Sequence, residues 1–246
     1  MKVAAVVVSH GHQRELEQSL PALREQVDEL VVIANVPGSV PPGIDAVLNE
    51  HPLGYGANVN KGAALTTAEL VLAANPDAVP EPGAVEALRA FVAAHPRCGV
   101  AGPRMVYPDG TPQPSRRRFP TVFGTIVRRT PLRRVVPQRR HFHLDEDQPV
   151  EPVQADWMLG GFLLLRRSML DELGGFDEGF RLYGEDIDLQ YRAGRAGWER
   201  WYVPQAVVRH EHQAETDKRW LTRRTLWHWA GILRFVRKHP ERLKAL

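Results

Sequence analysis

The sequence contains a single cysteine, Cys98, among its 246 residues. One cysteine cannot form an internal disulfide, and it excludes a zinc site built from several cysteines. The chain therefore belongs neither to the small disulfide-stabilised proteins nor to the cysteine-ligated zinc proteins.

Long apolar runs are also missing from the sequence. No stretch approaches the roughly 18 consecutive apolar residues that a membrane-spanning helix needs. The N-terminal apolar run at 3–8 is too short for a signal peptide, and no small-residue cleavage site follows it. We therefore expect a cytoplasmic protein. Its length, with 43% hydrophobic residues, suits one large domain or one domain with an appendage.

Acidic residues are nearly absent from two segments, although the whole chain has a net charge of only +3. Residues 115–140 contain nine arginines and no acidic residue, and residues 217–246 contain nine lysines and arginines against two acidic residues. The rest of the chain is therefore net negative. Basic surfaces commonly bind phosphate groups or anionic lipid, and the alternative is that both segments are ordinary solvated faces.

Short apolar segments alternate with amphipathic segments in the first hundred residues. The pattern predicts strands at 3–8, 30–34, 46–48 and 70–74 and helices at 14–27, 54–67 and 82–95. Such alternation is typical of an α/β fold built from βαβ units, with a Rossmann-like, mostly parallel central sheet and helices on both faces.

The second half of the chain has a less regular order of predicted strands and helices. It predicts strands at 100–102, 105–107, 161–166, 201–203 and 207–210 and helices at 168–173 and 184–196. The arginine- and proline-rich stretch at 115–140 lacks a clean period and is expected to form a loop with short helical pieces. We expect one domain over 1–216, followed by a basic amphipathic helical tail over 217–246.

A candidate metal site follows the strand predicted at 70–74. Asn75-Pro76-Asp77 comes directly after this strand, and ligands of open α/β sheets bind beyond the carboxyl ends of strands. Asp77 there can hold a divalent cation that also binds a diphosphate, although the same tripeptide is also an ordinary turn. His210 is the best isolated imidazole for completing such a site, with His212 as a competitor.

A glycine-rich helix start at 54–62 is a candidate phosphate or ribose site. Gly56 permits close approach of a ligand to the backbone, and a helix N-terminus can receive phosphate oxygens. Asn58, Asn60 and Lys61 are an unusual concentration of polar residues for such a place. The alternative is a glycine-rich loop with ordinary helix capping.

The segment 177–188 carries five acidic residues interleaved with aromatic residues. Glu185 and Asp186 fall at the N-terminus of a predicted helix, where the helix dipole favours a negative charge. We expect this to keep a carboxylate ionised and able to act as a general base. Asp188 lies three residues after Glu185, so one member of that pair is expected to serve the structure.

Taken in order, these motifs resemble family 2 glycosyltransferases, most of all the bacterial rhamnosyltransferase-like and galactofuranosyltransferase-like members. The resemblance runs from residue 3 to about 212 and rests on Val-Val-Val-Ser-His, Leu-Gly-Tyr-Gly-Ala-Asn-Val-Asn-Lys-Gly, Asn-Pro-Asp, Gly-Gly-Phe-Asp-Glu, Tyr-Gly-Glu-Asp-Ile-Asp-Leu and Val-Pro-Gln-Ala-Val-Val-Arg-His. It implies a GT-A fold, with a nucleotide-binding half at about 1–103 and an acceptor half at about 104–216. It also implies inverting transfer from a dTDP- or UDP-linked sugar, assisted by Mg²⁺ or Mn²⁺.

The resemblance also assigns roles to residues. Asp77, in its Asn75-Pro76-Asp77 form, matches the last aspartate of the metal-binding motif, and His210 matches a histidine that ligates the metal in some members. Asp186 matches the general base, with Glu185 beside it. The acceptor side is implied at Trp157 and the Gly160-Gly161 turn, although Trp157 could equally be a buried structural residue.

Two departures lie at the nucleotide end of the implied site. Ser9 and His10 fall where the family usually has Thr-Tyr-Asn, and Asn35 falls in a loop whose usual first aspartate is replaced by Ala34. These departures leave the identity of the nucleotide open.

The two basic segments suit a glycan or polyprenyl-linked acceptor at an anionic membrane surface, on the inner face of the cell membrane. The tail combines tryptophans and arginines as interfacial helices do, and its alternatives are packing on the body or on a second subunit of a homodimer. Rival functions are a nucleotidyltransferase of the same fold, a nucleic-acid-binding module and an inactive scaffold. The first lacks its triphosphate loop after the first strand, and the second leaves 177–188 without a purpose, so we expect no nucleic acid as partner.

Overall fold

The structure is a computed structural model that describes residues 1–119, 135–136, 148–211 and 223–241. Its first half contains β1 (Val3–Ser9), α1 (Gln13–Arg24), β2 (Glu29–Ala34), β3 (Val47–Leu48), α2 (Tyr55–Ala64), β4 (Leu70–Ala74), β5 (Ala78–Pro80), α3 (Ala84–Ala94) and β6 (Cys98–Val106). Its second half contains β7 (Pro112–Gln113), β8 (Arg116–Arg117), β9 (Val153–Gln154), β10 (Trp157–Met158), β11 (Phe162–Arg166), α6 (Arg167–Leu173), α7 (Glu185–Arg195), β12 (Glu199–His210) and α9 (Arg223–Lys238).

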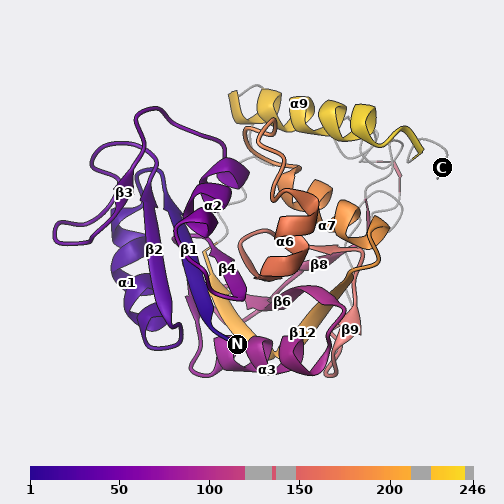
Figure 1. The fold of residues 1–246 in the computed structure, drawn as a ribbon, viewed down its shortest axis with the longest axis horizontal. Coiled ribbons are helices and arrows are strands. Elements are labelled where there is room, and N and C mark those ends of the chain that lie inside the picture. Colours follow the sequence, from indigo (N-terminus) through magenta and orange to yellow (C-terminus); the bar gives the residue numbers. More distant parts are fainter. Residues whose placement is uncertain (120–134, 137–147, 212–222, 242–246) are drawn as a thin grey trace.

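One mixed sheet organises the molecule in the order β3-β2-β1-β4-β11-β6-β12-β5 (Figure 1). The strands from β3 to β4 are parallel, as expected for βαβ units. β11 then runs antiparallel to both of its neighbours, and β12 is parallel to β6. A small second sheet pairs β10 with β8, so part of the arginine-rich segment is a strand.

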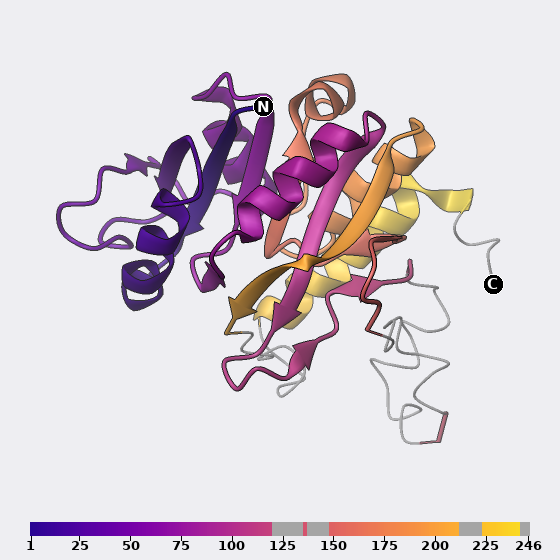
Figure 2. The ribbon, with the colours of Figure 1, turned by 90° about the horizontal axis from the view of Figure 1, so that it is seen from below.

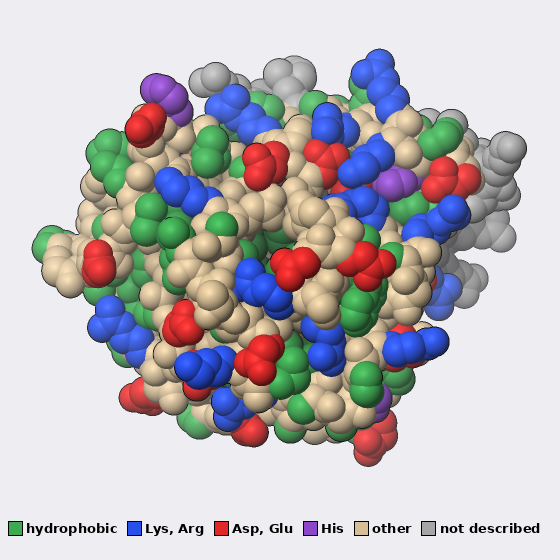
Figure 3. Space-filling model, in the orientation of Figure 1, with side chains coloured by type: hydrophobic (Ala, Val, Ile, Leu, Met, Phe, Trp, Pro, Cys, Tyr) green, Lys and Arg blue, Asp and Glu red, His purple; other side chains and the backbone are tan. Residues whose placement is uncertain are grey.

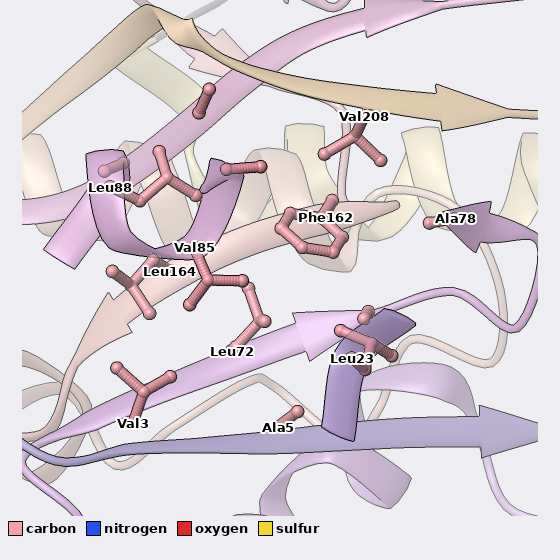
Figure 4. Packing of buried hydrophobic residues seen from close by; sticks show 14 of the residues in the cluster. Val3, Ala5, Leu23, Leu72, Ala78, Val85, Leu88, Phe162, Leu164 and Val208 are labelled. Carbon is pink, nitrogen blue, oxygen red and sulfur yellow. The ribbon is translucent and has the colours of Figure 1, made fainter. Parts of the chain in front are cut away.

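Helices cover both faces of the sheet, which confirms the predicted layers. On one face, α1 and α3 bury aliphatic side chains such as Leu23, Val85 and Leu88 against β1, β4 and β11 (Figure 4). Figure 2 shows α3 lying along β6 and β12. On the other face, α2, α6 and α7 pack through residues such as Val59 and Leu189. β1 and β4 are buried at every position because both faces are covered.

Several predicted boundaries need correction. The strands predicted at 100–102 and 105–107 are one strand, β6, and those predicted at 201–203 and 207–210 are one strand, β12. The pairing of β12 with β6 shifts register between Val203 and Val207, and this irregularity explains why the sequence pattern looks like two strands. α2 ends at Ala64, three residues earlier than expected.

The predicted tail helix is present as α9, which begins at Arg223, and residues 217–222 lie outside the described residues. α9 lies across the top of the molecule, over α7 and the chain that leads into it (Figure 1). Within the described part of the chain, no helix combines the length and apolar character needed to cross a membrane.

Candidate active site

Asp77 and His210 meet because of the way the chain turns after β4. The turn 75–77 leads into β5, which pairs antiparallel with the end of β12 and places His210 opposite Ala78. His210 Nε2 consequently lies 3.4 Å from Asp77 Oδ1. His210 is buried, whereas the Asp77 side chain is 21% exposed and can reach a ligand from solvent. The structure thus brings together the two residues predicted to hold a metal.

The neighbours of His210 define which of its ring nitrogens carries the proton. Nδ1 lies 3.0 Å from Gln113 Oε1, and an amide oxygen can only accept a hydrogen bond. Nε2 lies 3.3 Å from the amide nitrogen of Asn75, which can only donate. With the two amide groups in this orientation, the proton lies on Nδ1, and Nε2 accepts a hydrogen bond from Asn75 beside the carboxylate of Asp77. An imidazole nitrogen and a carboxylate oxygen are both common metal ligands.

Glu185 and Asp186 begin α7, immediately after Gly184, whose φ of 101° is accessible to glycine at little cost. Two backbone N–H groups hold the Asp186 carboxylate: Gly160 donates to Oδ2 at 3.0 Å and Ile187 donates to Oδ1 at 2.9 Å. The Gln190 side chain bonds both the N–H and the carbonyl of Met158, which ties α7 to β10. The base predicted from sequence is therefore held rigidly.

The Gly160-Gly161 turn, which connects β10 to β11, separates the carboxylate pair from the Asp77–His210 pair. A Cβ atom at Gly160 would lie 3.0 Å from Asp186 Cβ, and one at Gly161 would lie 3.2 Å from His210 Nε2. The carbonyl of Gly161 also accepts a hydrogen bond from the backbone of Asn75 at 2.8 Å. A side chain at either glycine would be in tight contact with its half of the site, so that Asp186 or His210 would have to shift by a few tenths of an ångström.

Burial changes the ionisation of this site. Removal from water, together with the neighbouring Asp186, raises the pKa of Glu185 to about 8, and burial also raises the pKa of Asp186. The sequence predicts that the helix dipole keeps a carboxylate ionised, and burial opposes this effect at both members of the pair. The desolvation of a buried charge outweighs the favourable but small effect of a helix end.

Two residues of the site are not predicted from the sequence. Gln113 fixes the tautomer of His210 from β7, a strand of two residues with no clear signal of its own. Tyr55 donates a hydrogen bond to the carbonyl of Gly160 at 3.1 Å. Burial and the charges of Glu185, Asp186 and Asp77 raise the pKa of Tyr55 far above its usual range. A tyrosine between two glycines at a helix start was the available signal.

Three of the residues predicted to contact the nucleotide, Ser9, His10 and Asn35, lie at the carboxyl ends of β1 and β2. The Asn35 amide nitrogen lies 3.1 Å from His10 Nδ1, and its oxygen accepts hydrogen bonds from Leu53 N–H and from Asn49. Ser9 is buried and bonds the carbonyl of Ser39. His10 is exposed, so it is the member of this group that is accessible to a ligand.

The polar residues of α2 hold neighbouring loops. Asn58 is fully buried and accepts a hydrogen bond from Asn49, and Lys61 donates to Asn49 at 2.8 Å. Asn60 bonds both the N–H and the carbonyl of Phe176. At Gly56, a Cβ atom would lie 2.7 Å from the side chain of Phe176, so this glycine serves packing. The side chains of Asn58, Asn60 and Lys61 are thus engaged within the protein, and their contact with a nucleotide stays a prediction.

Two further residues have structural roles. Trp157 is only 6% exposed, and its indole N–H donates to the carbonyl of Arg118 at 2.8 Å, which matches the structural alternative for this residue. Asp188 is fully buried and bonds Arg192, Lys238 and His239. It is therefore the member of the Glu185–Asp188 pair that serves the structure. His212 lies outside the described residues.

The chain offers a small set of metal ligands. Among residues 1–119, 135–136, 148–211 and 223–241, no group of three or more histidine, cysteine, aspartate or glutamate residues could hold a metal ion. Asp77 and His210 therefore supply one carboxylate and one imidazole. Such a pair suits a cation whose other ligands are water and substrate phosphates.

Comparison with known proteins identifies the family of this chain. Residues 24–231 match the family described as "Glycosyltransferase like family 2". The chain belongs to glycosyltransferase family 2. This family 2 glycosyltransferase is 33% identical to the N-acetylglucosaminyl-diphospho-decaprenol L-rhamnosyltransferase of Mycobacterium tuberculosis, over 89% of its own length and 78% of the relative's. The resemblance to rhamnosyltransferases inferred from the motifs is thereby confirmed.

Solved structures confirm the GT-A fold of this glycosyltransferase. GalNAc-T7, crystallised with UDP, GalNAc and Mn²⁺, aligns with a TM-score of 0.64 at 18% identity, over 85% of this chain and 43% of the other. The mannosyltransferase PcManGT of Pyrobaculum calidifontis, in complex with GDP-Man and Mn²⁺, aligns with a TM-score of 0.59 at 17% identity, over 95% and 64%. This chain spans less than half of the GalNAc-T7 chain.

Proposed function

We propose that this glycosyltransferase moves a rhamnose-like hexose from a dTDP- or UDP-linked donor to a hydroxyl of a glycan or lipid-linked acceptor, with inversion at the anomeric carbon. The observation that carries this proposal is the Gly160-Gly161 turn, which holds the Asp186 carboxylate and the Asp77–His210 pair on its two sides. The Asp77–His210 pair suits the leaving diphosphate, and the Asp186 carboxylate suits the attacking hydroxyl.

Asp77 and His210 would hold a divalent cation, Mg²⁺ or Mn²⁺. The donor set supports this assignment, because a carboxylate oxygen and an unprotonated imidazole nitrogen lie 3.4 Å apart. When bound, the cation would neutralise charge on the departing nucleoside diphosphate. Two proteins of similar fold, GalNAc-T7 and PcManGT, were crystallised with Mn²⁺, which is consistent with this choice of ion.

Asp186 would accept the proton of the acceptor hydroxyl. The N–H groups of Gly160 and Ile187 stabilise its charged form, whereas buried Glu185 Oε2 has no hydrogen-bond partner among the described residues. We therefore expect Glu185 to hold the proton of this coupled pair and Asp186 to carry the negative charge. A raised pKa makes Asp186 a stronger base than an exposed aspartate, because a base gains basicity with its pKa.

The acceptor would be presented at an anionic membrane surface. The mycobacterial relative is named for a decaprenol-linked acceptor, and a lipid-linked acceptor here would keep the enzyme near the inner face of the membrane. α9 supplies a suitable surface, since Trp229 and Leu233 on its outer side are 36% and 49% exposed. Lysine and arginine side chains, interspersed with acidic ones, lie over this upper part of the molecule (Figure 3), and the basic ones complement anionic headgroups. The alternative is that a second copy of the chain binds this exposed side of α9 and forms a homodimer.

A donor panel with and without Mn²⁺ tests the transferase reaction. The purified protein is mixed with dTDP- and UDP-linked sugars, and its melting temperature is followed, because a ligand that binds the folded state raises apparent stability. The stabilising donor is then incubated with a synthetic polyprenyl-diphosphate-linked N-acetylglucosamine. We expect release of the nucleoside diphosphate and a product with inverted anomeric configuration. Formation of a nucleotide sugar from a nucleoside triphosphate and a sugar phosphate would instead support the nucleotidyltransferase alternative.

A further inference from the structure

The inner face of α9 packs against the loop that delivers the catalytic carboxylates. Gly231, Phe235 and His239 are all buried and recur every four residues, so they form one face of the helix. This face lies on the chain between Phe176 and α7 (Figure 1). The opposite side, with Trp229 and Leu233, is exposed. α9 thus packs on the body of the protein through its buried inner side.

The closest approach lies at Gly231. A Cβ atom there would lie 2.3 Å from the backbone carbonyl oxygen of Tyr183, so only glycine permits this contact. Tyr183 has a φ of 69°, and in the part of the chain that the structure describes no other non-glycine residue has a positive φ. A left-handed conformation at a large side chain persists where the surrounding structure holds it. Tyr183 and Gly184 are the last two residues before Glu185 and Asp186.

Ion pairs hold α9 to both ends of this loop. Asp177, near the start of the loop, bonds Arg234 at 2.7 Å and Lys238 at 2.8 Å. Lys238 also contacts Asp188 in the first turn of α7, at 3.0 Å, and His239 contacts Asp188 at 2.8 Å. Lys238 therefore bridges the start of the loop and the helix that follows it. These contacts join α9 to the chain both before and after Tyr183.

We propose that α9 is a brace that holds Tyr183 and Gly184 in their left-handed conformations and thereby positions Asp186 against Gly160, with Gly231 as a positioning residue. This proposal rests on the proposed function, because it assumes that Asp186 is the base. It explains why a basic helix at the end of the chain packs beside the active site. The proposed effect of α9 is on the orientation of the carboxylate, and its test therefore compares turnover with donor affinity.

Gly231→Ala and Ala230→Gly together test this brace. Alanine favours a helix over glycine, so Gly231→Ala strengthens α9 itself while obstructing its approach to Tyr183. Ala230→Gly weakens the helix at an exposed neighbouring position and leaves the approach intact. If α9 mattered only for stability, Ala230→Gly would be the harmful change. The brace predicts the reverse for turnover.

The expected result for Gly231→Ala is a kcat lower by about tenfold or more, since small misplacements of a catalytic group are costly. The KM for the donor, and the Kd for dTDP or UDP with Mn²⁺, should stay within about twofold of wild type. Lys238→Gln should show the same split in weaker form, with Lys238→Arg restoring turnover. Lys238→Gln keeps the inference testable if Gly231→Ala fails to fold.

Two outcomes would overturn the brace: unchanged kcat in Gly231→Ala and Lys238→Gln, or a parallel loss of nucleotide affinity and kcat. Both outcomes differ from what failure of the proposed function would give. If the proposed function fails, the wild-type protein transfers no sugar, or Asp186→Asn transfers sugar as well as the wild type.

Discussion

The backbone N–H of Gly160 donates a hydrogen bond to Asp186 Oδ2 at 3.0 Å. Through this bond, a turn that follows β10 orients a carboxylate on α7. The adjoining Gly161 contacts the other half of the site, since its carbonyl accepts a hydrogen bond from the Asn75 N–H and a Cβ atom on it would lie 3.2 Å from His210 Nε2. Two consecutive glycines therefore lie between the proposed base and the proposed metal ligands of this glycosyltransferase.

Replacement of Asp186 by asparagine should abolish most of the turnover. The amide keeps an oxygen for the Gly160 hydrogen bond but cannot take a proton from the acceptor, so kcat should fall by about 10² to 10⁴. Nucleotide affinity, measured by calorimetry, should stay at the wild-type value. Asp171→Asn changes an exposed aspartate on α6 in the same way and should leave kcat unaltered. Full turnover in Asp186→Asn would disprove its role as base.

Glu185 should make the stability of the protein depend on pH. Its pKa rises from an ordinary 4.5 to about 8 on folding, so the folded state binds the proton more tightly than the unfolded state. This contribution to stability is complete below about pH 4.5 and is lost as the pH rises toward about 8. Between those values the free energy of unfolding should fall by up to about 1.4 kcal/mol per pH unit from this residue.

Urea unfolding of the wild type and of Glu185→Gln at pH 5.5 and pH 8.0 measures this contribution. The glutamine variant should lose a large part of the pH dependence, whereas Glu25→Gln, at an exposed position, should retain it. Equal pH dependence in all three proteins would contradict the raised pKa.

Gln113→Leu should weaken the response to the metal. Leucine has a similar size but no oxygen to hold the proton on His210 Nδ1, so Nε2 is no longer kept unprotonated toward Asp77. Loss of such a partner commonly reduces metal affinity about 10- to 100-fold, and the Mn²⁺ concentration for half-maximal activity should rise accordingly. Gln205→Leu, an exposed control on β12, should behave as wild type. An unchanged Mn²⁺ titration for Gln113→Leu would argue against the tautomer assignment.

The outer face of α9 should bind vesicles that contain anionic lipid. Trp229→Ser combined with Leu233→Ser removes apolar contact area, and a loss of about 1.4 kcal/mol would lower the partition coefficient tenfold. Leu65→Ser, at a residue that is 54% exposed outside α9, serves as control. Co-sedimentation with phosphatidylglycerol vesicles measures the effect. A concentration-dependent dimer that the double variant abolishes, without vesicle binding by the wild type, would favour the homodimer instead.

Local sequence signals predicted much of this molecule. β4 spans Leu70–Ala74, the range expected from its unbroken apolar run, and α7 begins at Glu185 after a glycine, as its acidic start indicated. β12 is predicted as two pieces because Pro204 and Gln205 interrupt its apolar run, and its pairing with β6 shifts register at the same place. Gln113 was missed because its function depends on a partner in β12, which no local pattern reveals.

The sequence by itself determined the alternation of strands and helices, the glycines at 160–161 and the order of the motifs, because these depend on local backbone preferences and on residue type. Only the tertiary structure decided which polar groups meet, which carboxylates lose their water and which face of α9 is covered. Burial and the distances between groups remote in sequence arise when the sheet assembles. The raised pKa of Glu185 and the approach of Gly231 to Tyr183 therefore belong to the fold.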